Sequence, residues 1–415
     1  SAVFFLQNFY YRGGGMRIVL KYGGSSVATV EKIQKIADYL IELKKEYDEI
    51  VVVASAMGKT TDGLIKLAKE ITSNPNQREL DSLMSIGEQQ TVTLMAMALT
   101  AKGQKAISLT GFQAGIKTSG VHTKNKIANI SSERIETLLR EGNIDIITGF
   151  QGINNSGDIT TLGRGGSDTS AVALAVALNC ECRIYTDVEG IYSVDPRLYP
   201  KAKFLDKISY EEMMEMANLG AGVMETRAVE LGKKYNIPIF VGKSLSYTGG
   251  TYIMEKDIAL EDKLITGISV TKEIIVTNIS NVPFSSENIA EIFSTIDECG
   301  LNINMITQNI NRYMRVEISF SCQASEKYLL EQVVEKIRAK FSTCDIELNE
   351  NLGMLSIVGV GMINNSGIAG KFFTSLSKGN INFYQVTTSE ISISCSIDRE
   401  NIEKAVNLVA EEFSL

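Results

Sequence analysis

Strand-like and helix-like patterns alternate along residues 16–253, and this alternation limits the fold more than any other feature of the chain. Short apolar runs predict strands at 18–20, 50–54, 106–109, 144–148, 183–186 and 239–241. Helical periodicity separates them, most clearly at 30–43, 83–101 and 223–235. Such alternation is typical of an α/β fold with a mainly parallel sheet. We therefore predict an α/β sandwich over this part of the chain.

A glycine-rich stretch, Thr-Leu-Gly-Arg-Gly-Gly-Ser-Asp, covers residues 161–168, between a predicted hairpin at 150–162 and an apolar helical run at 169–178. Glycines let the backbone approach a ligand, and a helix N-terminus offers free N–H groups to an anion. We expect Ser167 and Asp168 to cap this helix. The guanidinium of Arg164 suits a carboxylate or phosphate. The stretch predicts a site for a small anionic molecule.

A second glycine loop follows the first predicted strand. Lys21-Tyr-Gly-Gly-Ser-Ser26 places a lysine before a glycine turn and a helix start. A strand-to-helix turn alone explains one such loop, but two in one domain, each with a cation, favour phosphate chemistry. Ser55 and Asp187 also follow predicted strands, and parallel strands end at a common edge where ligands bind.

Several familiar sites are excluded. Gly58-Lys59-Thr60 lacks the earlier glycine of a Walker loop, because Val53 stands there. The stretch at 163–166 lacks the third glycine of a dinucleotide fingerprint. No protein-kinase signature is present. We read the single histidine, His122, as a solvated loop residue, so histidine-based catalysis and a protein metal site have little support.

Composition narrows the class further. A chain of 415 residues predicts two or more domains. The net charge of −8 argues against nucleic-acid binding. Six scattered cysteines suit reduced thiols in a cytoplasmic protein, and no apolar run is long enough to span a membrane. We treat residues 1–15 as an extra N-terminal segment that is a poor signal peptide, and expect the fold to begin at Met16.

The C-terminal part contains an internal repeat with a period of about eighty residues. Residues 289–304 and 368–382 each read as a helix, a glycine turn and a strand. The repeat predicts two small βαββαβ modules. They contain no clustered acid, base or nucleophile, so we expect binding rather than catalysis; a purely structural or dimerising tail is the alternative.

Four ordered motifs resemble the signatures of aspartokinases, enzymes of the amino-acid kinase family that make 4-phospho-aspartate from aspartate and ATP. They lie at residues 21–27, 55–62, 161–168 and 186–197. The repeated tail resembles their paired ferredoxin-like ACT domains, one inserted in the other. The resemblance implies a catalytic domain at 16–255, a regulatory region at 264–415, and a strand of the C-terminal module at 267–271. It also implies the first step of lysine, threonine and methionine biosynthesis.

The resemblance implies roles for individual residues. Lys21 matches the lysine at the transferred phosphoryl group and Asp168 the residue that orients it. The aspartate-binding positions match Thr61, Glu88, Arg164 and Ser167. The nucleotide-binding positions match Lys21, Gly23, Gly24, Thr186, Asp187, Tyr192, Arg197, Gly222 and Val223. We expect Mg²⁺ to be held mainly through ATP, with no protein metal cage. An aspartate carboxylate is already ionised near neutral pH and needs no general base.

Two positions depart from the family pattern. Ser25 replaces a threonine and keeps its hydroxyl. Gly222 replaces a lysine that often reaches the nucleotide, which puts nucleotide affinity in question.

The tail is expected to bind a feedback inhibitor, with lysine the first choice and threonine the second. The turn and strand positions that match an effector site are Val282, Ser285, Asn288, Asn302, Ile303, Asn304 and Met305. We expect a homodimer through the ACT domains, or a tetramer, and no nucleic-acid or membrane partner. The alternatives are another amino-acid kinase, of the glutamate or uridylate type, and a catalytically silent amino-acid sensor.

Overall fold

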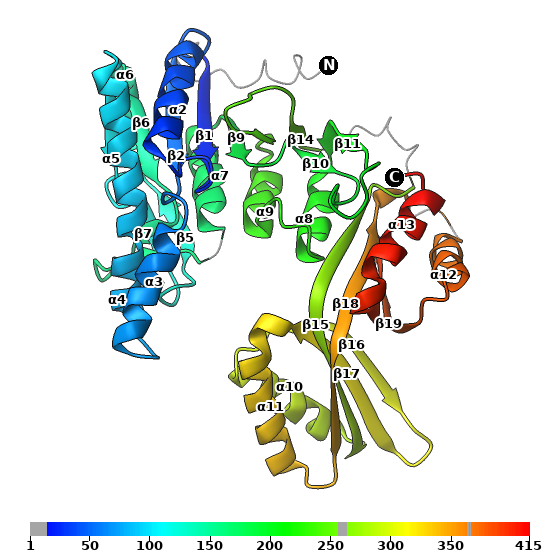
Figure 1. Ribbon diagram of the computed structural model, residues 1–415. Coiled ribbons are helices and arrows are strands. Elements are labelled where there is room, and N and C mark those ends of the chain that lie inside the picture. The colour runs from blue at the N-terminus through cyan, green and yellow to red at the C-terminus, as the bar shows by residue number, and fades with distance from the viewer. Residues whose placement is uncertain (1–14, 164, 256–263, 363–364, 366) are drawn as a thin grey trace. The chain divides into compact units, whose positions relative to one another are not determined.

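The computed structural model describes residues 15–163, 165–255, 264–362, 365 and 367–415 (Figure 1). They form two compact units. The first contains residues 15–191, 204–217 and 222–255, and the second contains residues 192–203, 218–221 and 264–415. Two short segments within the range expected for the catalytic domain thus pack with the second unit. The boundaries 16–255 and 264–415 stay a prediction.

The first unit is built on an eight-stranded sheet with the order β12-β14-β13-β9-β1-β2-β6-β3. All of its described pairings are parallel except β13 with β14. The strands are β1 (Arg17–Tyr22), β2 (Glu49–Ala54), β3 (Ala106–Leu109), β6 (Ile144–Thr148), β9 (Glu181–Thr186), β12 (Lys207–Ile208), β13 (Ile239–Lys243) and β14 (Thr251–Ile253). All six strands expected from the sequence are present.

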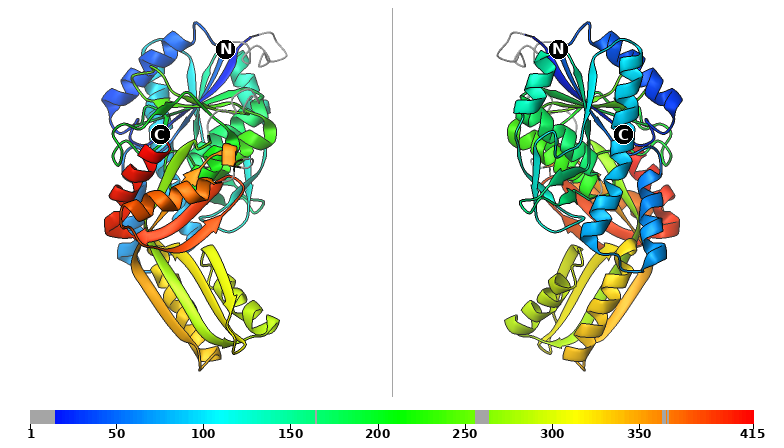
Figure 2. Two further views of the ribbon diagram at one scale, coloured as in Figure 1. Left: turned by 90° about the vertical axis from the view of Figure 1, so that its right-hand side faces the viewer. Right: turned by 90° about the vertical axis from the view of Figure 1, so that its left-hand side faces the viewer.

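Helices cover both faces of this sheet, because its strands are apolar on both sides. On one face, α2 (Val30–Leu43) and α5 (Ile86–Ala101) pack against Leu20, Val52 and Ile146. On the other, α7 (Gly166–Leu178) contacts β1, β2 and α9 (Thr226–Tyr235). Figure 2 shows the sheet between blue helix α2 and the green helices. Residues that alternate along β1 therefore face different helices.

A second, four-stranded sheet leads into the glycine-rich loop. Its order is β5-β4-β7-β8, and the hairpin β7–β8 ends directly before that loop, as expected. Its strands are β4 (Ile116–Ser119), β5 (Lys126–Ile130), β7 (Gln151–Ile153) and β8 (Ile159–Thr161). The unit's other elements are α3 (Thr60–Ile71), α4 (Gln77–Met84), α6 (Glu133–Arg140), β11 (Phe204–Leu205) and most of α8 (Tyr210–Asn218); β10 (Ile191–Tyr192) lies at a boundary between the units. The helix expected at 83–101 is divided at Ser85 into α4 and α5.

The second unit contains one six-stranded sheet with the order β16-β17-β15-β18-β20-β19, and all of its described pairings are antiparallel. Its elements are β15 (Gly267–Pro283), α10 (Ser286–Glu298), β16 (Asn304–Ile310), β17 (Arg315–Gln323), η3 (Ala324–Glu326), α11 (Lys327–Lys340), β18 (Asp345–Val358), η4 (Val360–Met362), α12 (Ile368–Lys378), β19 (Phe383–Thr388), β20 (Ser392–Asp398), η5 (Arg399–Asn401) and α13 (Ile402–Glu412).

The long strands β15 and β18 run through two βαββαβ modules (Figure 1). The first module follows chain order, with α10 and α11 packed over a core that includes Ile279, Phe320 and Val333. The second has α12 and α13 over a core around Leu355 and Phe372. Residues 267–271 of β15 pair with 354–358 of β18, so a strand that precedes the first module completes the second. The α/β sandwich followed by ferredoxin-like modules confirms the expected fold class.

No helix within the described ranges is both long enough and apolar enough to cross a membrane.

Candidate active site

Lys21 and Asp168 form a buried ion pair in the first unit. Lys21 lies near the end of β1 and Asp168 in the first turn of α7. Lys21 Nζ is 2.6 Å from Asp168 Oδ1, and the two side chains are only 11% and 13% exposed. The contact is an ion pair without hydrogen-bond geometry at Oδ1. A carboxylate beside the ammonium fixes its position while leaving its other N–H groups for an anion.

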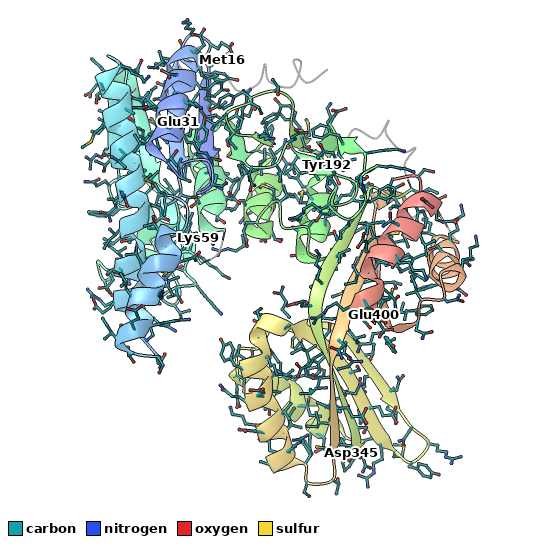
Figure 3. All side chains as sticks on the ribbon, in the orientation of Figure 1. Met16, Glu31, Lys59, Tyr192, Asp345 and Glu400 are labelled. Carbon is teal, nitrogen blue, oxygen red and sulfur yellow. The ribbon has the colours of Figure 1, made fainter. Side chains whose placement is uncertain are left out.

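The loop after β1 is shaped for close approach to a ligand. A Cβ placed on Gly23 would lie 3.4 Å from Lys21 Nζ, and one placed on Gly24 would lie 2.9 Å from the carbonyl oxygen of Ala56. The second distance is too short for a side chain. The N–H of Gly58 donates to the carbonyl of Gly24 at 3.0 Å, which joins this loop to the start of α3. Lys59, labelled in Figure 3, precedes that helix.

The end of β9 lies beside this loop. The N–H of Gly23 donates to the carbonyl of Tyr185 at 3.2 Å, so Thr186 and Asp187 follow a strand fixed to the glycine loop. Thr186 Oγ1 donates to Asp187 Oδ1 at 3.0 Å. Ser244 donates its N–H to the carbonyl of Thr186, and its hydroxyl accepts a 2.9 Å hydrogen bond from Ser26. Sequence reasoning missed these two serines, because their contact joins segments far apart in the chain.

Glu88 is a buried carboxylate with an available oxygen. It lies in the first turn of α5 and is 3% exposed. The N–H of Ala56 donates to Oε1 at 3.2 Å, whereas Oε2 is buried and has no partner among the described residues. Burial raises the pKa of Glu88 to about 7. Thr61 lies near Gly87, the residue before Glu88, since a Cβ on Gly87 would lie 3.6 Å from Thr61 Oγ1. The arrangement suits a small ligand that carries a cation.

The glycine-rich loop differs from expectation at its helix start. The N-cap of α7 is Gly165, with φ of 68°, and no side chain caps the helix. The predicted capping by Ser167 and Asp168 is therefore wrong, because both residues lie within the first turn. A Cβ on Gly149 would lie 2.7 Å from Ser167 Oγ, so the Ser167 side chain packs closely against the backbone at Gly149. Arg164, the other predicted ligand of the loop, lies outside the described residues.

The remaining nucleotide positions fall into two groups. Gly222 and Val223 lie just before α9, and a Cβ on Gly222 would meet no atom within 4 Å. Tyr192 (Figure 3) and Arg197 belong to the second unit, where Arg197 pairs with Asp195 at 2.8 Å. Their assignment to the nucleotide stays a prediction.

His122 lies in a loop, as expected, but its side chain is only partly exposed. Its Nδ1 lies 2.7 Å from Oδ2 of Asp81, a carboxylate with no exposed surface, and the histidine side chain is 24% exposed. The sequence did not reveal this contact because the partner lies forty-one residues earlier in the chain.

The positions proposed for an effector lie in the first module of the second unit. Ser285 caps α10 by accepting a hydrogen bond from the N–H of Asn288, whose side-chain amide donates to the carbonyl of Pro283. Asn302 donates to Glu326 at 3.1 Å. The Val282 side chain lies in the core, and Met305, which follows Ile303 and Asn304, is also buried, with φ of 38°.

The first unit thus combines a lysine beside a glycine cradle with a buried carboxylate. Ala56 contacts both halves of this site. Its carbonyl leaves no room for a side chain at position 24, and its N–H donates to the carboxylate of Glu88. Such a site can neutralise phosphate charge on one side and hold an ammonium group on the other. Within the described residues there is no group of three or more His, Cys, Asp or Glu side chains that could hold a metal ion.

Comparison with known proteins agrees with this geometry. The model of the amino acid kinase family matches residues 16–243, and that of an ACT domain matches residues 355–413. An aspartokinase of Bacillus sp. (strain MGA3) is 44% identical over 400 residues, covering 96% of this chain and 97% of the relative. Two solved structures of E. coli aspartokinase III share the fold: the complex with aspartate and ADP (R-state) has a TM-score of 0.81 at 23% identity, covering 96% of this chain and 100% of that one. The complex with lysine and aspartate (T-state) has a TM-score of 0.75 at 24% identity, covering 95% and 99%.

The chain therefore belongs to the amino acid kinase family. Within that family it belongs to the aspartokinases, which confirms the resemblance drawn from the four sequence motifs.

Proposed function

We propose that this aspartokinase binds ATP at the Lys21 cradle and aspartate beside Glu88, and transfers the γ-phosphoryl group to the β-carboxylate. One observation carries the assignment of the two halves. The 56–58 turn touches Gly24 through the carbonyl of Ala56 and Glu88 through its N–H, so phosphate and amino acid would meet across that turn. The residue roles below are part of this proposal.

In the proposed reaction a β-carboxylate oxygen forms a bond to the γ-phosphorus while the bond from phosphorus to the bridging oxygen of ADP breaks. The electron pair of that bond leaves on ADP. Because the attacking carboxylate is already ionised, no residue has to remove a proton. Catalysis then depends on positioning and charge neutralisation, as in other phosphoryl transfers. Lys21, oriented by Asp168, supplies positive charge at the transferred group.

Aspartate is proposed to place its ammonium group on the unpartnered Oε2 of Glu88. Thr61, Ser167 and Arg164 would hold its carboxylates. The nucleotide would contact Gly23, Gly24, Thr186, Asp187, Gly222 and Val223 of the first unit. Mg²⁺, bound through ATP, would neutralise phosphate charge.

We propose that the second unit binds lysine as a feedback inhibitor, with threonine as the second choice. The E. coli aspartokinase III structure with lysine supports this ligand class. In this chain the start of α10 offers free N–H groups to an α-carboxylate, and Asn302 and Asn304 offer amide oxygens to an ammonium group.

We further propose a homodimer, or a tetramer, formed through the ACT modules. Edge strand β16 supports this, because it exposes Ile306 (54%) and Ile310 (46%) beside unpaired backbone groups. The proposed location is the cytoplasm, which agrees with six free cysteines.

One assay tests the activity and its alternatives. Acyl phosphate formed from ATP and Mg²⁺ is trapped as hydroxamate with aspartate or glutamate as acceptor, while lysine and threonine are titrated. Aspartate-dependent product that lysine suppresses supports the proposal. A preference for glutamate would indicate another amino-acid kinase, and binding of lysine without product would indicate a silent sensor. Sedimentation of the same samples measures the oligomeric state.

A further inference from the structure

We propose that Asp81 is a positioning residue for the aspartate half of the site. It holds the glycine-rich loop in register with the helix that carries Glu88, and His122 keeps it in place. The proposal rests on the proposed function, since it concerns how the assigned aspartate ligands are aligned.

Asp81 is a fully buried carboxylate that receives donors from two separate segments. It lies on α4 and has no exposed surface. The N–H of Thr123 lies 3.1 Å from both of its oxygens, and Thr161 Oγ1 donates to Oδ1. With His122 Nδ1 at 2.7 Å from Oδ2, three groups surround the carboxylate. A buried charge is tolerated only with such partners, so the pattern is built rather than incidental.

These contacts join the two elements that carry the proposed aspartate ligands. Asp81 is followed by Ser85, the residue that separates α4 from α5, and then by Glu88. Thr161 ends β8 and is followed by the loop with Arg164 and Ser167. The contact between Asp81 and Thr161 therefore sets the distance between Glu88 and that loop.

A second tie runs in parallel. The Gln151 side chain donates to the carbonyl of Ser85 at 2.9 Å, and Gln151 is paired with Thr161 in the β7–β8 hairpin. The hairpin is thus bound both to α4, through Asp81, and to the α4–α5 junction, through Ser85.

The turn containing His122 closes the arrangement. A Cβ on Gly163 would lie 3.1 Å from the carbonyl of Thr123, so this turn packs on the start of the glycine-rich loop. The N–H of Asn125 donates to the carbonyl of Thr161 at 3.0 Å. Arg227 donates to the carbonyls of Leu162 and Asn125 and so binds both the start of the glycine-rich loop and the segment after His122. These contacts restrain the backbone segments 122–125 and 161–163, which carry the groups that bind Asp81.

Two neighbouring threonines provide a matched test. Thr161 and Thr160 lie on β8 with 0% and 1% exposure, but Thr160 Oγ1 pairs with Thr118 at 2.5 Å and not with Asp81. Valine has the shape of threonine without the hydroxyl, so Thr161→Val and Thr160→Val each remove one buried hydrogen bond. Misalignment by a fraction of an ångström is costly for bound reactants. We expect Thr161→Val to raise the aspartate KM about tenfold, with the ATP KM unchanged within experimental error, and Thr160→Val to change neither.

Two further variants check the role of His122. His122→Asn places an amide nitrogen at the position of Nδ1 and so keeps a donor for Asp81, and it should leave the aspartate KM close to the wild-type value. His122→Phe lacks the donor and should resemble Thr161→Val. Each variant is measured in the full-length protein by the hydroxamate assay, together with its melting temperature.

The outcomes separate this proposal from the function it rests on. Wild-type protein that forms no aspartate-dependent hydroxamate contradicts the proposed function. If the wild type is active and Thr161→Val and Thr160→Val change the aspartate KM equally, or Thr161→Val changes both KM values equally, then Asp81 has only a structural role and the proposal is wrong. A selective rise in the aspartate KM that His122→Phe reproduces and His122→Asn does not supports the proposal.

Discussion

The two units bury different kinds of polar side chain. Among the described residues, the first unit buries charged groups, namely Arg17, Lys21, Glu49, Asp81, Glu88, Asp145, Glu181 and Glu212. In the second unit, the buried polar side chains are serines, threonines and one glutamine, Gln385. A buried charge costs far more than a buried hydroxyl unless it is paired. The first unit therefore carries buried charges whose cost must be offset by partners or ligands, while the polar groups buried in the second unit are neutral.

Pairing varies within the first unit as well. Lys21 and Asp168 form an ion pair, and Asp81 is surrounded by donors. Glu88 keeps one oxygen without a described partner, and Asp145 keeps two. Burial raises the pKa of Asp145 to about 8, and the nearby charge of Glu49 adds to the rise. An unpaired buried carboxylate therefore marks either a ligand position or a cost to stability, and mutation distinguishes these two cases.

The largest expected effect tests a paired charge. Lys21→Ala should lower kcat by about 10²–10³, because it removes positive charge at the developing phosphoryl group. Steady-state kinetics with saturating ATP and aspartate measures the loss. Lys35→Ala is the control, since Lys35 forms an exposed ion pair with Glu31 on α2 and has no proposed role in the site. If Lys21→Ala keeps more than half of the wild-type kcat, the buried charge does not act on the substrate.

The second prediction concerns Glu88. Its pKa of about 7 means that the ionised form, which binds an ammonium group, predominates only above that pH. The kcat/KM for aspartate should therefore fall as the pH drops below 7, since this ratio reports groups of the free enzyme. Glu88→Gln should raise the aspartate KM about thirtyfold or more and remove this acid limb. A variant that keeps the wild-type pH profile would assign the titration to another group.

The third prediction concerns Asp145, the unpaired carboxylate with no proposed ligand. Its raised pKa means that the folded protein binds a proton that the unfolded chain releases, so the contribution of Asp145 to stability should decrease between pH 4 and pH 8. Asp145→Asn should increase the free energy of unfolding at pH 8 by about 1–3 kcal/mol and change it little at pH 4. Denaturant unfolding at both pH values measures this. A variant that is destabilised at pH 8 would mean that the charge has an attractive partner.

The smallest expected effect lies in the second unit. Thr277 is fully buried, and its hydroxyl has no partner among the described residues. Thr277→Val should change the free energy of unfolding by only about 0–1 kcal/mol, in the stabilising direction, because it replaces an unpaired hydroxyl by a methyl group. Thermal unfolding measures this change in stability. Ser356→Ala is the contrasting variant: it removes the hydrogen bond between Ser356 and Ser394 and should be less stable than the wild type. Loss of more than about 2 kcal/mol in Thr277→Val would show that the neutral interior of this unit contains a required polar contact.

Local pattern was a reliable guide to part of this structure. The strands of the large sheet and the hairpin before the glycine-rich loop follow from apolar runs bounded by turn residues, because strands buried on both faces are mainly apolar. The position of Lys21 between a strand and a glycine turn predicted an anion site, and that site stays a prediction. Helix boundaries were less certain: the break at Ser85 and the Gly165 N-cap depend on backbone dihedrals that no periodicity encodes.

The amino-acid sequence by itself determined the class of fold, the two glycine loops, the repeated modules and the family, since each is written in residues close together in the chain. Only the tertiary structure decided which distant groups meet. It paired Lys21 with Asp168, tied His122 to Asp81, and left Glu88 buried with a raised pKa. It also showed that residues 267–271 complete a module whose other strands come much later. The physical reason is that pairing, desolvation and strand order depend on contacts between segments far apart in the chain, which local pattern does not record.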